Sequence, residues 1–147
     1  PVLIGPDTES GRWVSTVADK VGCDYRVFAK TRFGDREVAI DTGKIEDLGQ
    51  STPVILDDIV STGRTMINAA SEMVETGLPK PVCIAVHAVF AGDALQAMEK
   101  SDIVRVVTCN TISHSTNDID VSGLIIDELL DPSAQLSGFD HDDRLAG

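Results

Sequence analysis

The chain has 147 residues, of which 42% are hydrophobic, and its 24 acidic and 12 basic residues give a formal net charge of −12. This length and composition allow one domain with a buried core and exclude a disordered chain. The acidic balance argues against a nucleic-acid-binding protein, which would need a basic footprint. We see no membrane span and no signal peptide.

Apolar runs and helical periodicity alternate along the chain. The sequence predicts strands over 2–4, 24–30, 54–56, 82–89 and 103–108, and helices over 12–21, 64–76, 93–100 and 123–130. A polar loop at 31–36 and a return strand at 37–41 predict a small β-hairpin flap. Residues 110–120 are predicted to form a polar loop, and Ser122 to cap the last helix. Residues 1–130 would then form the domain, and 131–147 an acidic, poorly ordered tail.

This alternation predicts an α/β fold of three layers, a mostly parallel sheet with helices on both faces. Ligands of such sheets bind at the carboxyl ends of the strands. The segments 5–11, 57–65, 90–92 and 110–115 all follow predicted strands. We therefore expect them to converge on one edge of the sheet and to form a site there.

The most informative segment is 53–66, which reads Pro-Val-Ile-Leu-Asp-Asp-Ile-Val-Ser-Thr-Gly-Arg-Thr-Met. An apolar strand is followed by the carboxylates Asp57 and Asp58, then by a loop rich in hydroxyls and glycine, then by a helical pattern. Loop N–H groups and the positive end of a helix dipole can bind a phosphate. The two carboxylates can accept hydrogen bonds from ribose hydroxyls or hold Mg²⁺ through water.

A simpler interpretation of this segment is a turn followed by a helix cap, because Ser and Thr are preferred capping residues. The doubled aspartate favours the binding site, since adjacent carboxylates repel each other unless a ligand, a metal or hydrogen bonds compensate. The three cysteines, Cys23, Cys83 and Cys109, are widely spaced and have no zinc-ligand pattern. They indicate a reducing, cytoplasmic setting.

The segment at 54–65 resembles the phosphoribosyl-diphosphate signature of type I phosphoribosyltransferase folds. Four more segments resemble the C-terminal half of ribose-phosphate diphosphokinase (PRPP synthetase). These are Gly5-Pro6-Asp7, Lys30-Thr31-Arg32, Val86-His87-Ala88-Val89-Phe90 and Thr108-Cys109-Asn110-Thr111-Ile112. Their order and spacing agree with that family over roughly residues 2–130.

The resemblance implies the formation of PRPP and AMP from ribose 5-phosphate and ATP, with Mg²⁺ as cofactor. It implies that Lys30 and Arg32 act in catalysis by neutralising charge on the transferring phosphates. Substrate would be bound by a set of residues on and before the phosphate loop, namely Asp57, Asp58, Ser61, Thr62, Gly63, Arg64 and Thr65. Asp7 would serve the metal.

Several of these residues have competing interpretations. Asp7 could be a turn or helix-capping residue instead of a metal ligand, and Lys30 and Arg32 could be solvated cations on a surface loop. Arg64 stands where the family often has glycine, and it is either a solvated residue or an added charge for the phosphate. His87 is better interpreted as a core histidine than as a catalytic base. His114 borders the predicted site without an assigned role.

The family's enzymes have a second, N-terminal half that supplies much of the ATP site, and this chain contains no such half. We therefore expect a piece of a longer protein whose partners are that half, ribose 5-phosphate, ATP and PRPP, and a homo-oligomer when complete. Two alternatives stay open. One is a phosphoribosyltransferase that consumes PRPP, and the other is a non-catalytic regulatory subunit, against which Lys30 and Arg32 count.

Overall fold

The computed structural model describes residues 1–28, 31–33, 36–38 and 51–130. Six of its strands form one sheet in the order β2-β1-β5-β6-β7-β8, and every neighbouring pair is parallel. These strands are β1 (Val2–Gly5), β2 (Asp24–Val27), β5 (Pro53–Val60), β6 (Val82–Ala88), β7 (Arg105–Cys109) and β8 (Asn117–Ile119). A separate antiparallel ribbon is formed by β3 (Thr31–Phe33) and β4 (Arg36–Val38), so the predicted hairpin is present, but its first strand lies in the segment that was predicted to be a polar loop.

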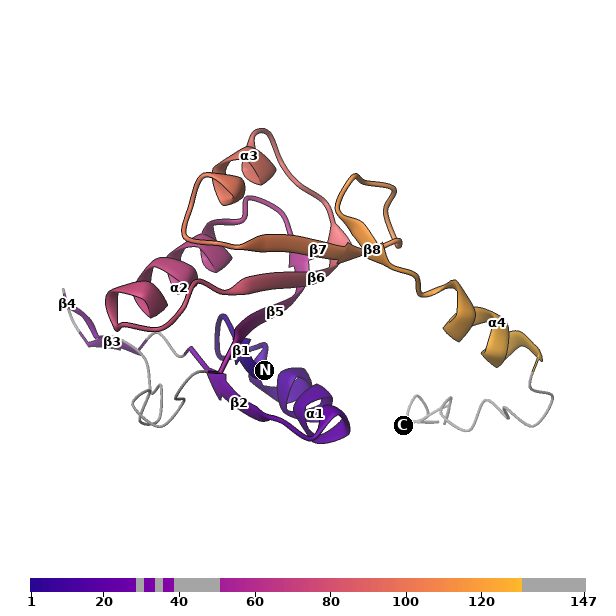
Figure 1. Ribbon diagram of the computed structural model, residues 1–147, viewed down its shortest axis with the longest axis horizontal. Helices are drawn as coiled ribbons and strands as arrows, with labels where there is room; N and C mark the ends of the chain where they lie inside the picture. Colours follow the sequence, from indigo (N-terminus) through magenta and orange to yellow (C-terminus); the bar gives the residue numbers. More distant parts are fainter. Residues whose placement is uncertain (29–30, 34–35, 39–50, 131–147) are drawn as a thin grey trace, which may run out of the picture.

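Helices cover both faces of the sheet, so the predicted three-layer α/β fold is confirmed (Figure 1). The helices are α1 (Gly11–Val21), α2 (Arg64–Glu75), α3 (Ala94–Glu99) and α4 (Ser122–Leu130). On one face, Val14 and Ala18 of α1 pack with Leu3 of β1. On the other face, α2 and α3 cover the central strands with a larger apolar cluster that includes Met73 and Met98.

The periodicity of the sequence explains the two covering helices. Helix α2 buries Met66, Ala69, Ala70 and Met73, which recur at helical spacing and form one stripe. Helix α1 ends at Gly22, which has a φ of 73° and donates its N–H to the carbonyl of Ala18. This left-handed conformation favours glycine and ends the helix as the sequence predicts.

Three predicted features are wrong in position. Strand β5 runs on to Val60, so the acidic pair lies inside the strand and not after it, because pairing with β6 continues as far as Val60 and Ala88. The predicted polar loop at 110–120 contains β8, a strand too short to show an alternating pattern. Ser122 is the first residue of α4, and its N–H is bonded to the Asp120 carboxylate at 2.8 Å.

Helix α4 has no buried residue, and in Figure 1 it stands away from the sheet beyond β8. Its aliphatic side chains Leu124, Ile125, Ile126, Leu129 and Leu130 are all exposed. Within the part of the chain that the structure describes, no helix is long and apolar enough to cross a membrane.

Candidate functional site

The acidic pair lies near the carboxyl end of the central strand β5. Asp57 is half-buried and pairs in register with the buried Ala85 of β6, whereas Asp58 is exposed. Alternation along β5 directs Asp57 to the same face as the buried Ile55, toward α2 and α3. The strand therefore holds the two carboxylates in opposite directions, one in a partly covered position and one in solvent.

Asp57 resists ionisation in this position. Burial raises its pKa from 3.8 to about 6, the Asp58 N–H hydrogen bond lowers it, and the charges of Asp7 and Asp58 raise it further. The Asp58 N–H donates to Oδ1 of Asp57 at 3.0 Å. Since Asp7 acts on Asp57 through its charge, the structure brings the predicted metal residue from the β1–α1 loop close to the acidic pair, as the sequence predicts.

The loop from Ser61 to Gly63 connects β5 to α2. Gly63 is the N-cap residue of α2 with a φ of 70°, and a Cβ at this position would lie 2.7 Å from Sδ of Met98. Both the backbone conformation and this close approach require glycine. The exposed Thr62 hydroxyl lies 3.5 Å from the N–H of Arg64, a contact at the limit of a hydrogen bond.

A small cavity of about 110 Å³ opens beside this loop. Five of the seven predicted substrate residues line it, namely Asp57, Ser61, Thr62, Gly63 and Thr65. A cavity of this size has room for a group such as a phosphate. The first N–H groups of α2 lie at the same place, where the helix leaves them without intrahelical partners.

A second cavity of about 300 Å³ adjoins the first, since Thr65 lines both. It lies between the β1–α1 loop, which contributes Asp7, and the first two turns of α2. Arg64, Asn68 and Glu72 line it from α2, four residues apart and so on one helical face. The structure thus places Arg64 at this larger cavity, and not at the smaller one.

Asp7 has the role of a turn residue, one of the alternatives that the sequence left open, and Ser10 is the N-cap residue of α1. Its Oδ1 accepts the N–H of Ser10 at 2.9 Å, and its carbonyl accepts the Ser10 hydroxyl at 2.6 Å. Ser10 is 2% exposed, so these bonds fix the turn that begins α1. A carboxylate has two oxygens, and Oδ2 is not needed for this turn.

The predicted catalytic residues cannot be placed in the same detail. Lys30 lies outside the described residues, and for Arg32 the structure gives only the backbone, in β3. Phe28, two residues before Lys30, lines the larger cavity, and its N–H donates to the carbonyl of Gly5 at 2.7 Å. The last described residue before the flap therefore lies at the edge of the larger cavity.

The predicted magnesium ion would find carboxylates that suit it. Asp57 repels Asp7 and Asp58 electrostatically, and a cation would relieve that repulsion. The described residues contain no cluster of three or more His, Cys, Asp or Glu side chains that could enclose a metal. A Mg²⁺ site would therefore depend on one or two carboxylates together with waters and substrate oxygens.

The sequence did not identify Asn68 and Glu72, although their spacing from Arg64 is a signal that could have been used. The sequence predicted a core histidine at position 87, but His87 is half-buried. Its Nδ1 contacts the Thr111 hydroxyl at 2.9 Å. Thr111 is exposed and follows β7, and nothing in the sequence predicted its contact with His87.

Comparison with known proteins identifies the family. The model of the phosphoribosyl transferase domain matches residues 1–123. The ribose-phosphate pyrophosphokinase of Methanothermobacter thermautotrophicus is 30% identical over 131 residues, which are 89% of this chain and 46% of that protein. The enzyme of the same name from Sulfurisphaera tokodaii is 31% identical over 82% of this chain and 42% of that protein.

Solved structures agree with this result at the level of the fold. Phosphoribosylpyrophosphate synthetase from Mycobacterium smegmatis superposes with a TM-score of 0.70 at 21% identity, over 87% of this chain and 43% of that one. Adenine phosphoribosyltransferase from Giardia lamblia superposes with a TM-score of 0.55 at 17% identity, over 73% of this chain and 67% of that one.

The chain spans about half the length of the curated relatives that it matches. The predicted resemblance is confirmed by the domain model, by these relatives and by the synthetase fold. The chain therefore belongs to the phosphoribosyl transferase domain family, as a counterpart of the C-terminal half of the ribose-phosphate pyrophosphokinases.

Proposed function

We propose that this chain is the half of a ribose-phosphate diphosphokinase that binds ribose 5-phosphate and contributes to diphosphoryl transfer from Mg-ATP. The products are PRPP and AMP. The observation that carries the proposal is the small cavity between the acidic pair and the start of α2, which five predicted substrate residues line. The pyrophosphokinase relatives supply the reaction class.

In this proposal the 5-phosphate occupies the small cavity. The loop N–H groups, the hydroxyls of Ser61, Thr62 and Thr65, and the positive end of α2 bind its oxygens. Asp57 and Asp58 accept hydrogen bonds from the ribose hydroxyls. Arg64 stands between two residues that line the small cavity, and it adds a positive charge on the side of the larger cavity, which it lines.

The chemistry is an in-line displacement at phosphorus. The C1 hydroxyl of the ribose attacks the β-phosphorus of ATP and releases its proton to solvent, the bond between the α,β-bridging oxygen and the β-phosphorus breaks, and AMP leaves. Lys30 and Arg32 neutralise the charge on the transferring oxygens from the flap. A Mg²⁺ ion held near Asp7, Asp57 and Asp58 would supply further charge neutralisation.

The proposal includes a partner half that completes the ATP site, a homo-oligomeric complete enzyme and a cytoplasmic location. The curated relatives are pyrophosphokinases, which favours diphosphoryl transfer over a PRPP-consuming phosphoribosyltransferase. Lys30→Ala separates an enzyme from a regulatory subunit. In the completed enzyme this variant should lose the rate of the chemical step and keep sugar-phosphate binding.

The decisive experiment is calorimetric titration of this chain with ribose 5-phosphate and Mg²⁺. Asp58→Asn tests the acidic pair, and Asp19→Asn, an exposed aspartate on α1, is the matched control. We expect saturable binding that Asp58→Asn weakens and Asp19→Asn leaves unchanged. Absence of heat at millimolar ligand, with the chain shown to be folded, would contradict a self-sufficient sugar-phosphate site.

A further inference from the structure

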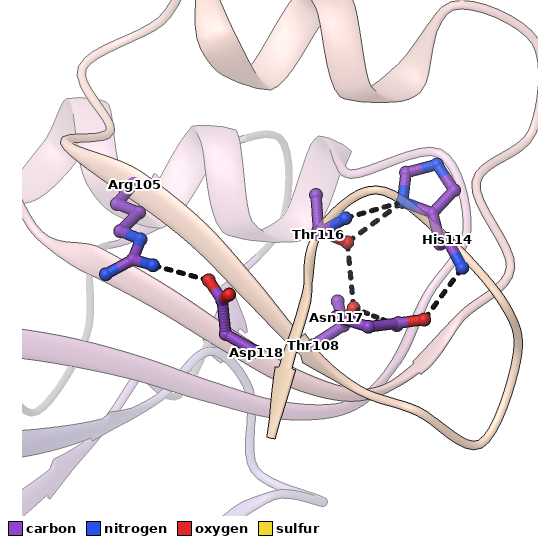
Figure 2. A network of polar contacts seen from close by, with 6 residues as sticks. All are labelled: Arg105, Thr108, His114, Thr116, Asn117 and Asp118. Atoms are coloured by element: carbon purple, nitrogen blue, oxygen red, sulfur yellow. Dashed lines mark hydrogen bonds and ion pairs between the residues drawn. The ribbon is translucent and has the colours of Figure 1, made fainter. Parts of the chain in front are cut away.

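A closed circuit of hydrogen bonds fixes the His114 ring in the loop between β7 and β8 (Figure 2). The His114 N–H donates to Oδ1 of Asn117 at 2.7 Å, and Nδ2 of Asn117 donates to the Thr108 hydroxyl at 2.9 Å. The Thr108 and Thr116 hydroxyls lie 2.8 Å apart, and the Thr116 hydroxyl lies 2.9 Å from Nδ1 of His114. The circuit therefore returns to the residue where it began.

The donors in this circuit can be assigned. The backbone N–H of Thr116 points to Nδ1 of His114 at 3.3 Å, so Nδ1 is an acceptor and the neutral ring carries its proton on Nε2. The Thr116 hydroxyl must then donate to Nδ1 as well, and the Thr108 hydroxyl must donate to Thr116. Thr108 is fully buried, so a broken circuit would leave a buried hydroxyl without its acceptor.

The loop between β7 and β8 is also attached to the neighbouring strand β6. The Thr111 hydroxyl donates to the carbonyl of Val86 at 2.8 Å. Because that hydroxyl has one hydrogen, the 2.9 Å contact with His87 requires Nδ1–H of His87 to be the donor. The β7–β8 loop is thus held in a fixed position against the end of β6.

The fixed His114 ring contacts Phe90, with ring centroids 4.5 Å apart and ring planes inclined at 36°. Phe90 in turn reaches the phosphate loop. Its N–H donates to the carbonyl of Val60 at 3.0 Å, and the next N–H, that of Ala91, donates to the carbonyl of Ser61 at 3.0 Å. A continuous set of contacts therefore leads from His114 to the start of the small cavity.

The backbone at Phe90 is strained. Its φ of 26° makes it the only residue other than glycine with positive φ in the described part of the chain. Such a conformation persists only where the surrounding structure holds it in place. The hydrogen bonds that the N–H groups of Phe90 and Ala91 donate to Val60 and Ser61, together with the His114 ring, supply that support.

We infer that His114 is a positioning residue for the sugar-phosphate loop and acts through Phe90. With its proton on Nε2, His114 accepts the hydrogen bonds that fix the β7–β8 loop, and its ring packs against Phe90. The N–H groups of Phe90 and Ala91 then hold the carbonyls of Val60 and Ser61, and so position these two residues, which line the small cavity. This inference rests on the proposed function for the identity of the ligand, but the coupling between the loops does not.

Two variants separate the two properties of the ring. His114→Phe keeps an aromatic ring against Phe90 and removes the acceptor, whereas His114→Asn keeps an acceptor near the place of Nδ1 and removes the ring. Asp118→Asn is the control, because it breaks only the exposed Arg105–Asp118 ion pair beside the same circuit. The experiment measures three quantities in each protein. They are the affinity for ribose 5-phosphate, the amide hydrogen exchange at Phe90 and Ala91, and the NMR resonances of the His114 ring nitrogens.

We expect both His114 variants to raise the dissociation constant about 10-fold, equivalent to roughly 1.4 kcal/mol, and to speed amide exchange at Phe90 and Ala91. The control should change neither. In the wild type, Nδ1 should resonate as an unprotonated nitrogen. A protonated Nδ1, or wild-type affinity and exchange in both variants, would overturn the inference. If the wild type binds no ribose 5-phosphate, the proposed function fails, and the exchange rates alone decide the coupling.

Discussion

The half-buried Asp57 predicts a specific dependence of stability on pH. Its pKa is raised from 3.8 to about 6, mainly by burial, so between these values the folded chain binds a proton that the unfolded chain has lost. Stability must therefore fall as the pH rises through this window. Above it, the folded state holds a carboxylate that water would solvate better.

The size of the effect follows from the shift. At 1.36 kcal/mol per pH unit, a rise from 3.8 to about 6 corresponds to at most roughly 3 kcal/mol. Partial solvent screening of a half-buried group reduces this, so we expect about 1–2 kcal/mol. Asp57→Asn should therefore stabilise the chain by about that amount at pH 8 and by close to nothing at pH 4.

Urea denaturation of the wild type and Asp57→Asn from pH 4 to pH 8 measures this difference. Asn keeps an acceptor for the Asp58 N–H, which donates at 3.0 Å to Asp57. Asp19→Asn is the control, because that exposed aspartate on α1 is not among the groups that shift the pKa of Asp57. A difference between wild type and Asp57→Asn that stays constant over this range would refute the reasoning.

Four further outcomes are expected. Mg²⁺ binding to the chain, followed by calorimetry, should tighten as the pH rises through about 6, because the cation needs the ionised Asp57, and Asp57→Asn should abolish that dependence. Gly63→Ala should cost about 1–3 kcal/mol in urea denaturation, because the new Cβ meets Met98 at 2.7 Å on a backbone with φ of 70°; unchanged stability would contradict this. Met73→Ala, at a fully buried position, should cost about 2–4 kcal/mol. Leu129→Ala in α4, where the side chain is 79% exposed, should cost less than about 0.5 kcal/mol, and an equal loss would refute the described packing.

The sequence predicted those parts of the fold and site that depend on local pattern. Helix α2 was predicted from periodicity, because its buried residues recur at helical spacing and so lie on one face. The loop between β5 and α2 was predicted because Gly63 and the neighbouring hydroxyls follow one another in the sequence, and in the structure they line one small cavity. The convergence of the loops after β1 and β5 followed from parallel pairing, and the effect of Asp7 on the pKa of Asp57 agrees with it.

The parts that failed depend on contacts between distant segments. The polar loop at 110–120 could not be recognised as a strand, because β8 pairs with β7 over a few residues and with an irregular register. The His114 circuit depends on Thr108, Thr116 and Asn117, whose hydroxyls and amide have many possible partners. The positive φ of Phe90 also has no sequence signal, since nothing in its side chain favours that conformation.

The position of the acidic pair inside β5 has a functional consequence. Had the strand ended at Leu56, Asp57 would lie on a solvated loop, where water would stabilise its charge. Because pairing with β6 continues through Asp57 and Ala85, the strand directs this carboxylate toward the covered face of the sheet. Burial and the charges of Asp7 and Asp58 then oppose its ionisation. A cation or a ribose hydroxyl would stabilise the ionised Asp57. The strand register that lowers the stability of the ligand-free chain above pH 6 therefore favours binding of the proposed ligands.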